Sequence, residues 1–169
     1  MGHARTTFIR SIGFIATLIA APTLWAQAVV SERTISVAAA QEAANAAMEQ
    51  CRKDGYRVTV TVVNRAGQIK AVLRDEGTGP HTVENSFRKA YTSATFRIPS
   101  GDIGKRPSTT VGAISVLQLA NTTGGEGALP IRSSNEVIGA IGVSGAPGGD
   151  KDAVCAQVGI DRIAAGLGG

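Results

Sequence analysis

Hydrophobic positions in this chain follow two periods, which together predict helices alternating with pairs of strands. In three stretches apolar residues recur every three or four positions, the spacing of an amphipathic helix. Four shorter stretches alternate at period two or are rich in β-branched side chains, as in half-buried strands. The predicted helices span 34–54, 80–97 and 151–165, and the predicted strands span 58–63, 68–74, 128–133 and 137–144.

Turn signals join these strands into two hairpins. Residues 64–67 read Asn-Arg-Ala-Gly between the first two strands, and Ser134-Asn135 separates the other two. Strands joined by hairpins are antiparallel, and amphipathic helices pack on the faces of such a sheet. The pattern therefore predicts an α+β fold. The apolar patch at 111–119 fits a short helix or a strand equally well.

The first 28 residues have the layout of a secretory signal peptide. Arg5 and Arg10 precede an uncharged apolar run at 11–24, which ends at the small residues of 26–28. The run is short for a membrane span. We expect cleavage after residue 28, which leaves one domain over 29–169, periplasmic or secreted and without a membrane anchor. An uncleaved signal anchor is the alternative.

Removal of the leader changes the charge balance. The whole chain has 17 Lys and Arg and 13 Asp and Glu, and the leader takes two arginines and no acid, which leaves 15 against 13. This excess is too weak and too scattered to indicate nucleic-acid binding. His3 also leaves, so His81 is the single histidine of the expected mature protein.

Two cysteines, Cys51 and Cys155, lie in predicted helices near opposite ends of the domain. In an oxidising compartment they are a candidate disulfide, and closing a loop of about 100 residues would stabilise the fold by roughly 4–5 kcal/mol. Two buried free thiols are the alternative, because a sequence does not show whether the Cβ atoms meet. Neither cysteine belongs to a Cys-x-x-Cys-His motif, which excludes covalent haem attachment.

His81 begins the second predicted helix. At about 100° per residue, Asn85 and Arg88 share its face, and Val83 lies about 160° away. The predicted buried stripe of this helix consists of Val83, Phe87, Ala90 and Ala94. An imidazole can ligate haem iron, and a nearby arginine can pair with a haem propionate. A histidine on a solvated or interface surface is the alternative.

Other candidate sites are weaker. Asp75, Glu76, His81 and Glu84 could gather around one cation, but their spacing is not that of a known metal site. The glycine-rich stretch 145–150 opens the last helix, whose backbone N–H groups could bind an anion, although tight turns explain these glycines as well. No nucleophile and base stand at a recognisable spacing, so hydrolase chemistry is not indicated.

Two blocks of sequence resemble the GlcG/HbpS family of haem-binding proteins. The first is GTGPHTVENSFRKAYT at 77–92, and the second is Leu-Pro-Ile at 129–131 followed by VIGAIGVSGAPGGD at 137–150 and a helix with Cys155-Ala156. Both stand in the family's order and spacing, and the similarity covers nearly all of the mature chain. The resemblance implies a profilin-like fold with a central five-stranded antiparallel sheet between helices. It also implies self-association into dimers or larger rings.

For function, the resemblance implies an exported protein that binds haem b non-covalently and sequesters or senses haem or iron. His81 would be the axial ligand and Arg88 a propionate partner, with Asn85 on the same face. Tyr91 and Thr92, farther along the helix, are the alternative oxygen ligands. A sensor kinase or a haem-uptake system is the expected partner. Exposed iron would give at most a weak peroxidase-like activity.

Two rival functions stay open at this point. In one, the protein binds or turns over a small hydroxy or keto acid such as glycolate, held by Arg88 and the helix N-terminus after Gly149. In the other, it is a purely structural partner protein, and His81 packs at a subunit interface.

Overall fold

The computed structural model describes residues 1–2, 29–107, 109 and 111–168 of the 169-residue chain. The chain divides into two units, Met1–Ser31 and Glu32–Gly169. The predicted leader falls almost wholly on 3–28, outside the described residues, so it stays a prediction. Within the described part of the chain, no helix combines the length and apolar character needed to cross a bilayer.

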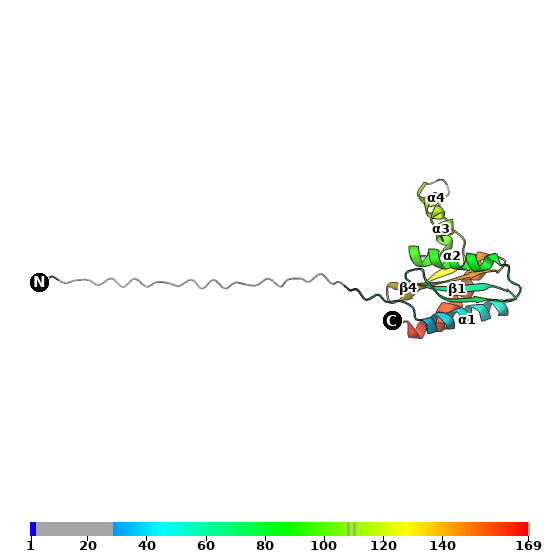
Figure 1. Ribbon diagram of the computed structural model, residues 1–169, viewed down its shortest axis with the longest axis horizontal. Helices are drawn as coiled ribbons and strands as arrows, with labels where there is room; N and C mark the ends of the chain where they lie inside the picture. The colour runs from blue at the N-terminus through cyan, green and yellow to red at the C-terminus, as the bar shows by residue number, and fades with distance from the viewer. Residues whose placement is uncertain (3–28, 108, 110, 169) are drawn as a thin grey trace. The chain divides into compact units, whose positions relative to one another are not determined.

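The second unit is built on a four-stranded antiparallel sheet with the strand order β2-β1-β4-β3. The strands are β1 (Thr59–Asn64), β2 (Ile69–Arg74), β3 (Ala128–Ser133) and β4 (Glu136–Ser144). The long helices are α1 (Val37–Lys53), α2 (His81–Phe96) and α5 (Gly149–Ile163), and the short ones are α3 (Gly101–Gly104), α4 (Val111–Gln118) and the 3₁₀ turn η1 (Ala164–Gly166). Helices α1 and α5 cover one face of the sheet and α2 covers the other (Figure 1).

The predicted α+β class and all four predicted strands are confirmed, but the expected count of five strands is wrong for the described residues. The segment before α1 comes nearest to a fifth strand, because the Ile35 amide donates to the Ile138 carbonyl of β4 at 3.1 Å. The ladder stops there, since Ser36 already caps α1 by accepting a hydrogen bond from the Ala39 amide. A single backbone hydrogen bond does not make a strand, so the described sheet has four strands.

The two faces of β1 carry different chemistry. Val60 and Val62 point to α1 and α5 and belong to the main hydrophobic core. Thr59 and Thr61 point to α2, although both are fully buried. The whole strand is therefore buried, and its polar side chains need hydrogen-bonding partners on the covering helix.

Helix α2 supplies these partners. The predicted stripe is therefore confirmed at Ala90 and Ala94, which are buried, and wrong at Val83. Thr82 Oγ1 lies 2.7 Å from Thr59 Oγ1, and Ser86 Oγ lies 2.8 Å from Thr61 Oγ1. The helix turns its hydroxyl-bearing face to the sheet, so Val83 is 40% exposed and Phe87 is only partly buried. We call these two bonded pairs the hydroxyl seam.

The hydroxyl seam requires a close approach of the helix to the sheet. A Cβ atom on Gly142 of β4 would lie 2.3 Å from the Ser86 carbonyl oxygen and 2.7 Å from the Ala90 amide nitrogen. Any side chain at this position would push α2 away from the sheet. Gly142 therefore fixes the depth at which α2, and with it His81, is seated.

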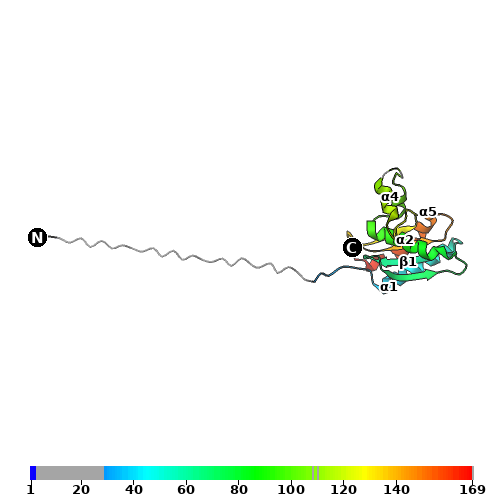
Figure 2. The same ribbon diagram turned by 45° about the horizontal axis from the view of Figure 1, so that its top comes forward.

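The ambiguous segment forms a helix, α4, which projects from the rest of the domain (Figures 1 and 2). Its base is anchored, because Thr122 Oγ1 donates to the Val116 and Leu119 carbonyls and the Thr122 carbonyl accepts from Arg88. Its sides are not covered: the exposed fractions are 79% at Val111, 45% at Ile114, 45% at Leu117 and 55% at Leu119. We call residues 111–119 the apolar arm.

Helices α1 and α5 pack closely through small residues. A Cβ atom on Gly159 would lie 2.5 Å from the Ala43 carbonyl oxygen and 3.2 Å from the Ala47 methyl. At this separation Cys51 and Cys155 form a disulfide with a Cα–Cα distance of 5.6 Å, which confirms the first of the two cysteine hypotheses. The bond closes a separation of 104 residues.

We predict that replacing both cysteines with serine lowers the free energy of unfolding by about 4 kcal/mol, because the unfolded chain loses a long cross-link. Urea unfolding followed by circular dichroism measures this difference. A reductant should lower the unfolding midpoint of the wild type and leave that of the double variant unchanged. Equal midpoints for oxidised wild type and double variant would contradict the prediction.

Candidate functional site

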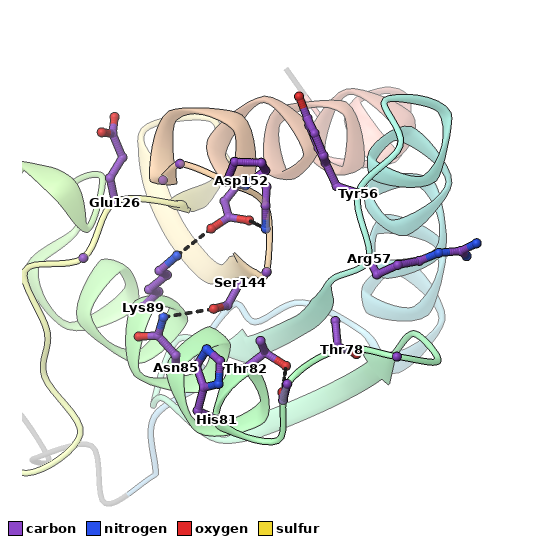
Figure 3. A pocket seen from close by; sticks show the side chains of 18 of the residues that line it. Tyr56, Arg57, Thr78, His81, Thr82, Asn85, Lys89, Glu126, Ser144 and Asp152 are labelled. Carbon is purple, nitrogen blue, oxygen red and sulfur yellow. Dashed lines mark hydrogen bonds and ion pairs between the residues drawn. The ribbon is translucent and has the colours of Figure 1, made fainter.

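A cavity of about 670 Å³ lies at the end of the sheet where β1 begins and β4 ends (Figure 3). The first turns of α2 and α5 meet there, and loops complete the wall. Its lining comprises His81, Thr82, Asn85 and Lys89 of α2, Ser144 of β4, Asp152 of α5, and parts of 55–57, 77–79, 125–126 and 145–149. We call it the α2–α5 cavity. Its size is typical of a small-molecule site.

A buried ion pair lies at one side of this cavity. Lys89 Nζ is 2.8 Å from Asp152 Oδ2 and donates to the Val143 carbonyl at 3.0 Å. The other carboxylate oxygen accepts the Ala146 amide at 3.0 Å. Burial raises the pKa of Asp152, while the Lys89 charge acts in the opposite direction. The pair links α2, β4, α5 and the loop between them.

Neither member of this pair was singled out from the sequence. Lys89 lies four residues after Asn85, on the same side of the helix. Helical periodicity could therefore have predicted that Lys89 lies near the same site as Asn85. Asp152 gave a weaker signal, because an acidic residue in the first turn of a helix is common on a solvated surface.

His81 begins α2 at the mouth of the cavity and is exposed. Its ring lies against the Gly79 backbone, where a Cβ atom would be 2.7 Å from His81 Cε1. Among the described residues, none forms a hydrogen bond with the imidazole. The ring is therefore accessible and free to accept a ligand.

The residues predicted beside His81 divide between two hollows. Asn85 lines the α2–α5 cavity, and its amide donates to Ser144 Oγ at 2.9 Å. Arg88 lies outside it, because its guanidinium donates to the Thr122 carbonyl at 2.6 Å and lies 3.6 Å from Glu84 Oε1. A smaller hollow of about 240 Å³ is lined by His81, Glu84, Asn85 and Arg88. His81 and Asn85 thus border both hollows.

Tyr91 and Thr92 are not part of either hollow. Tyr91 packs on Phe87, with ring centroids 5.8 Å apart, and on the turn at Gly67. Thr92 is buried, and its Oγ1 accepts the Thr123 amide at 2.9 Å. Ten residues of helix separate Tyr91 from His81, about 15 Å along the axis. The structure does not bring these alternative ligands to the cavity.

The alternative cation site does not form. No group of three or more His, Cys, Asp or Glu side chains is arranged for a metal ion within the described residues. Asp75 instead accepts two hydrogen bonds from Arg52, at 2.8 and 2.9 Å, and one from Arg57 at 3.2 Å. The Arg52 bonds hold the pKa of Asp75 well below its usual range. This clamp anchors the loop that leads to His81, because Thr78 bonds to the Asp75 carbonyl.

Helix α5 begins with acidic side chains at the place where an anion was considered. Gly148 is its N-cap, and Asp150 and Asp152 both lie in the first turn. These acidic side chains already compensate the positive end of the helix dipole, which weakens the case for a bound carboxylate. Arg88, the other group expected to hold a small acid, faces a different hollow. The geometry therefore does not favour the small-acid hypothesis.

We predict that Lys89→Met lowers the free energy of unfolding by about 3–5 kcal/mol at pH 7, because it leaves a buried carboxylate without its cation. Without Lys89 the folded-state pKa of Asp152 rises further, so the folded protein binds a proton more readily than the unfolded chain. Stability of the variant then falls as pH rises, and its deficit is smaller at pH 4 than at pH 7.

Urea unfolding at both pH values tests this prediction. Asp152→Asn added to Lys89→Met removes the unpaired charge and should recover part of the loss at pH 7. A deficit that is independent of pH and unaffected by the second substitution would show that lost packing, not charge, causes it.

A family model described as "Haem degrading protein HbpS-like" matches residues 35–161. Crystal structures of HbpS superpose well. One is 33% identical with a TM-score of 0.75 and covers 86% of this chain and 100% of that one. A double mutant of Streptomyces reticuli HbpS is 32% identical with a TM-score of 0.75 and covers 84% and 96%.

A structure of PduOC in complex with haem is more distant and shows the shared fold. It is 22% identical with a TM-score of 0.69, and covers 77% of this chain and 95% of that one. No curated protein matches the chain in sequence.

Proposed function

Because this chain belongs to the HbpS-like family, whose model spans residues 35–161, we propose that it is an exported protein that binds haem b non-covalently through His81. The observation that carries the proposal is the accessible imidazole of His81, which borders a cavity large enough for a cofactor and has no hydrogen-bonding partner among the described residues. Relatives named for haem binding or haem degradation support the ligand class.

The residues around the cavity fit an amphipathic cofactor. Tyr56, Ala146 and Pro147 provide apolar surface for a macrocycle. Arg57 at the rim is bonded to Asp75, whereas Arg88, which borders the smaller hollow, can pair with a carboxylate of a haem that lies over that hollow. Bound haem would supply iron-centred redox chemistry, which is the chemistry that haem degradation needs.

The protein's own residues would orient His81 rather than react. The Asp75 clamp holds the preceding loop, and the hydroxyl seam holds the first turns of α2. Both fix the imidazole before any ligand arrives, so little ordering entropy is lost on binding. Asn85, held by Ser144, presents a fixed amide to the same space.

We predict that hemin shifts the Soret band of the purified protein and that His81→Ala removes most of the shift, because the axial nitrogen is lost. Thr95→Ala, an exposed change on the same helix, is the matched control and should bind as the wild type does. Tyr91→Phe and Thr92→Val should also bind normally, since neither side chain lines the cavity.

Three results separate the possibilities. An unshifted spectrum with wild type contradicts haem binding. A full shift with His81→Ala but not with Tyr91→Phe or Thr92→Val would transfer the axial role to the oxygen ligand removed. Weaker binding by Arg88→Gln places a propionate over the smaller hollow, whereas unchanged binding by this variant places the haem at the α2–α5 cavity alone.

The proposal includes self-association and a role in haem sequestration or sensing in the periplasm or outside the cell, beside a sensor kinase or a haem-uptake system. The apolar arm supports self-association, since a helix that exposes Val111, Ile114 and Leu117 is normally covered by another surface. A second apolar surface lies on the same chain. It consists of Ile69 and Val72 on the edge strand β2 and Val83 and Phe87 on the flank of α2.

The area of the arm limits how much it can contribute to a contact with a second copy of the chain. An eight-residue helix is about 12 Å long and about 10 Å across, which gives a side surface of about 400 Å². An arm seated on the apolar surface of β2 and α2 would bury about half of this, or about 400 Å² counting both partners. A symmetric exchange of two arms reaches about 800 Å², so the neighbouring surfaces of the two copies would have to contribute the rest of a stable interface.

We predict that Val111→Asp with Ile114→Asp dissociates the oligomer, because two charges would have to be buried at the contact. Light scattering after size exclusion gives the mass of each species. Val154→Asp, at a similarly exposed apolar position on α5, is the control and should keep the wild-type mass. A monomeric wild type contradicts self-association, and an unchanged mass for the arm variant contradicts the arm as its surface.

A further inference from the structure

A second cavity, of about 490 Å³, lies at the opposite end of the sheet from His81. Four arginines from four separate segments line it: Arg33 before α1, Arg65 in the β1–β2 turn, Arg97 at the end of α2 and Arg132 in β3. Glu136 is the one acidic residue in its lining. We call it the arginine cavity.

Most of its positive charge is not compensated by the described residues. Arg65 forms an ion pair with Glu136. Arg33 donates to the Ser133 hydroxyl and Arg132 to the Arg97 carbonyl, both neutral acceptors. Four guanidiniums against one carboxylate leave three positive charges, and a guanidinium keeps its proton at every accessible pH. Like charges held together in this way are stabilised by an anion between them.

The backbone around the cavity is held in an uncommon conformation. Arg97 and Ser134 have φ values of 60° and 52°, in the left-handed region that few residues other than glycine adopt. The Arg97 carbonyl is fixed by Arg132 at 2.7 Å, and the Arg97 amide donates to the Ser93 carbonyl at 2.9 Å. Arg97 ends α2 and Ser134 lies in the β3–β4 turn, so both conformations belong to the chain reversals that bring these segments together at the cavity.

We propose that the arginine cavity binds a small polyanion with at least two adjacent phosphate or carboxylate groups. Guanidinium groups pair with both kinds of oxyanion through two parallel hydrogen bonds, and the Asn135 amide lines the same space. The volume suits a small molecule. The cavity is concave and its arginines come from four segments, so they converge on one point. This shape suits a small, discrete ligand better than the flat surface of an anionic membrane.

This site is separate from the proposed haem site. Strand β1 begins beside the α2–α5 cavity and ends one residue before Arg65, and its six residues span about 20 Å. Loss of either site should therefore leave the other intact. The inference does not rest on haem binding, and the two are tested separately.

Calorimetric titration of the purified protein with pyrophosphate and with citrate, at constant ionic strength, tests the proposal. Arg97→Asn removes one cation at a position where asparagine tolerates the left-handed backbone, and Arg33→Gln keeps a donor for Ser133. We expect each to weaken binding about tenfold, since each removes a charge-assisted hydrogen bond. Arg162→Gln, an exposed arginine on α5, is the matched control and should bind as the wild type does.

Preference for pyrophosphate or for citrate then identifies the natural ligand as a phosphate or a carboxylate compound. The proposal is overturned if neither anion binds the wild type, or if Arg97→Asn and Arg33→Gln bind no more weakly than Arg162→Gln. Binding to vesicles of anionic lipid without binding of either soluble anion also overturns it. So does a loss of hemin binding in the arginine-cavity variants, because the cavity would then serve the haem carboxylates.

Discussion

The buried ion pair between Lys89 and Asp152 is the contact on which the arrangement of this domain depends. It joins the helix on one face of the sheet to a helix on the other, past the end of β4. Gly127 makes room for it, since a Cβ atom there would lie 2.7 Å from Asp152 Cβ and 2.8 Å from Lys89 Nζ. A charge pair out of water tolerates little displacement of either partner. The ends of α2 and α5 are thereby held at the distance that leaves the α2–α5 cavity between them.

The hydroxyl seam determines which side chains of α2 are exposed at the surface. Because α2 uses hydroxyls to satisfy Thr59 and Thr61, the larger apolar side chains of its first two turns are left at the flank. Val83 and Phe87 then adjoin the uncovered face of β2. The polar packing of α2 on β1 therefore has two effects. It fixes the position of His81, and it leaves an apolar surface exposed. Ligand binding and self-association would thus depend on the same helix.

Most elements of this fold could be predicted because their signals are local. The turns at 64–67 and Ser134-Asn135, with β-branched runs on each side, were enough for both hairpins. Features set by distant contacts were missed or wrong. The predicted stripe of α2 was right at Ala90 and Ala94 but wrong at Val83, because the first turns of α2 face the threonines of β1. Lys89 was missed because it meets Asp152 across 63 residues. The fifth strand came from the resemblance, and the segment through Ile35 turns into α1 instead.

The covalent link between α1 and α5 has a consequence for how the chain reaches its native state. Its two sulfurs belong to the first and the last long helices, and β4, which lies between β1 and β3, also comes late in the chain. A chain that emerges N-terminus first can pack α1 only against β1 and β2 until β4 and α5 arrive. The core on this face of the sheet is therefore completed last by α5. A chain that ends before Cys155 cannot form this bond, so the oxidised pair marks a domain whose last long helix is in place.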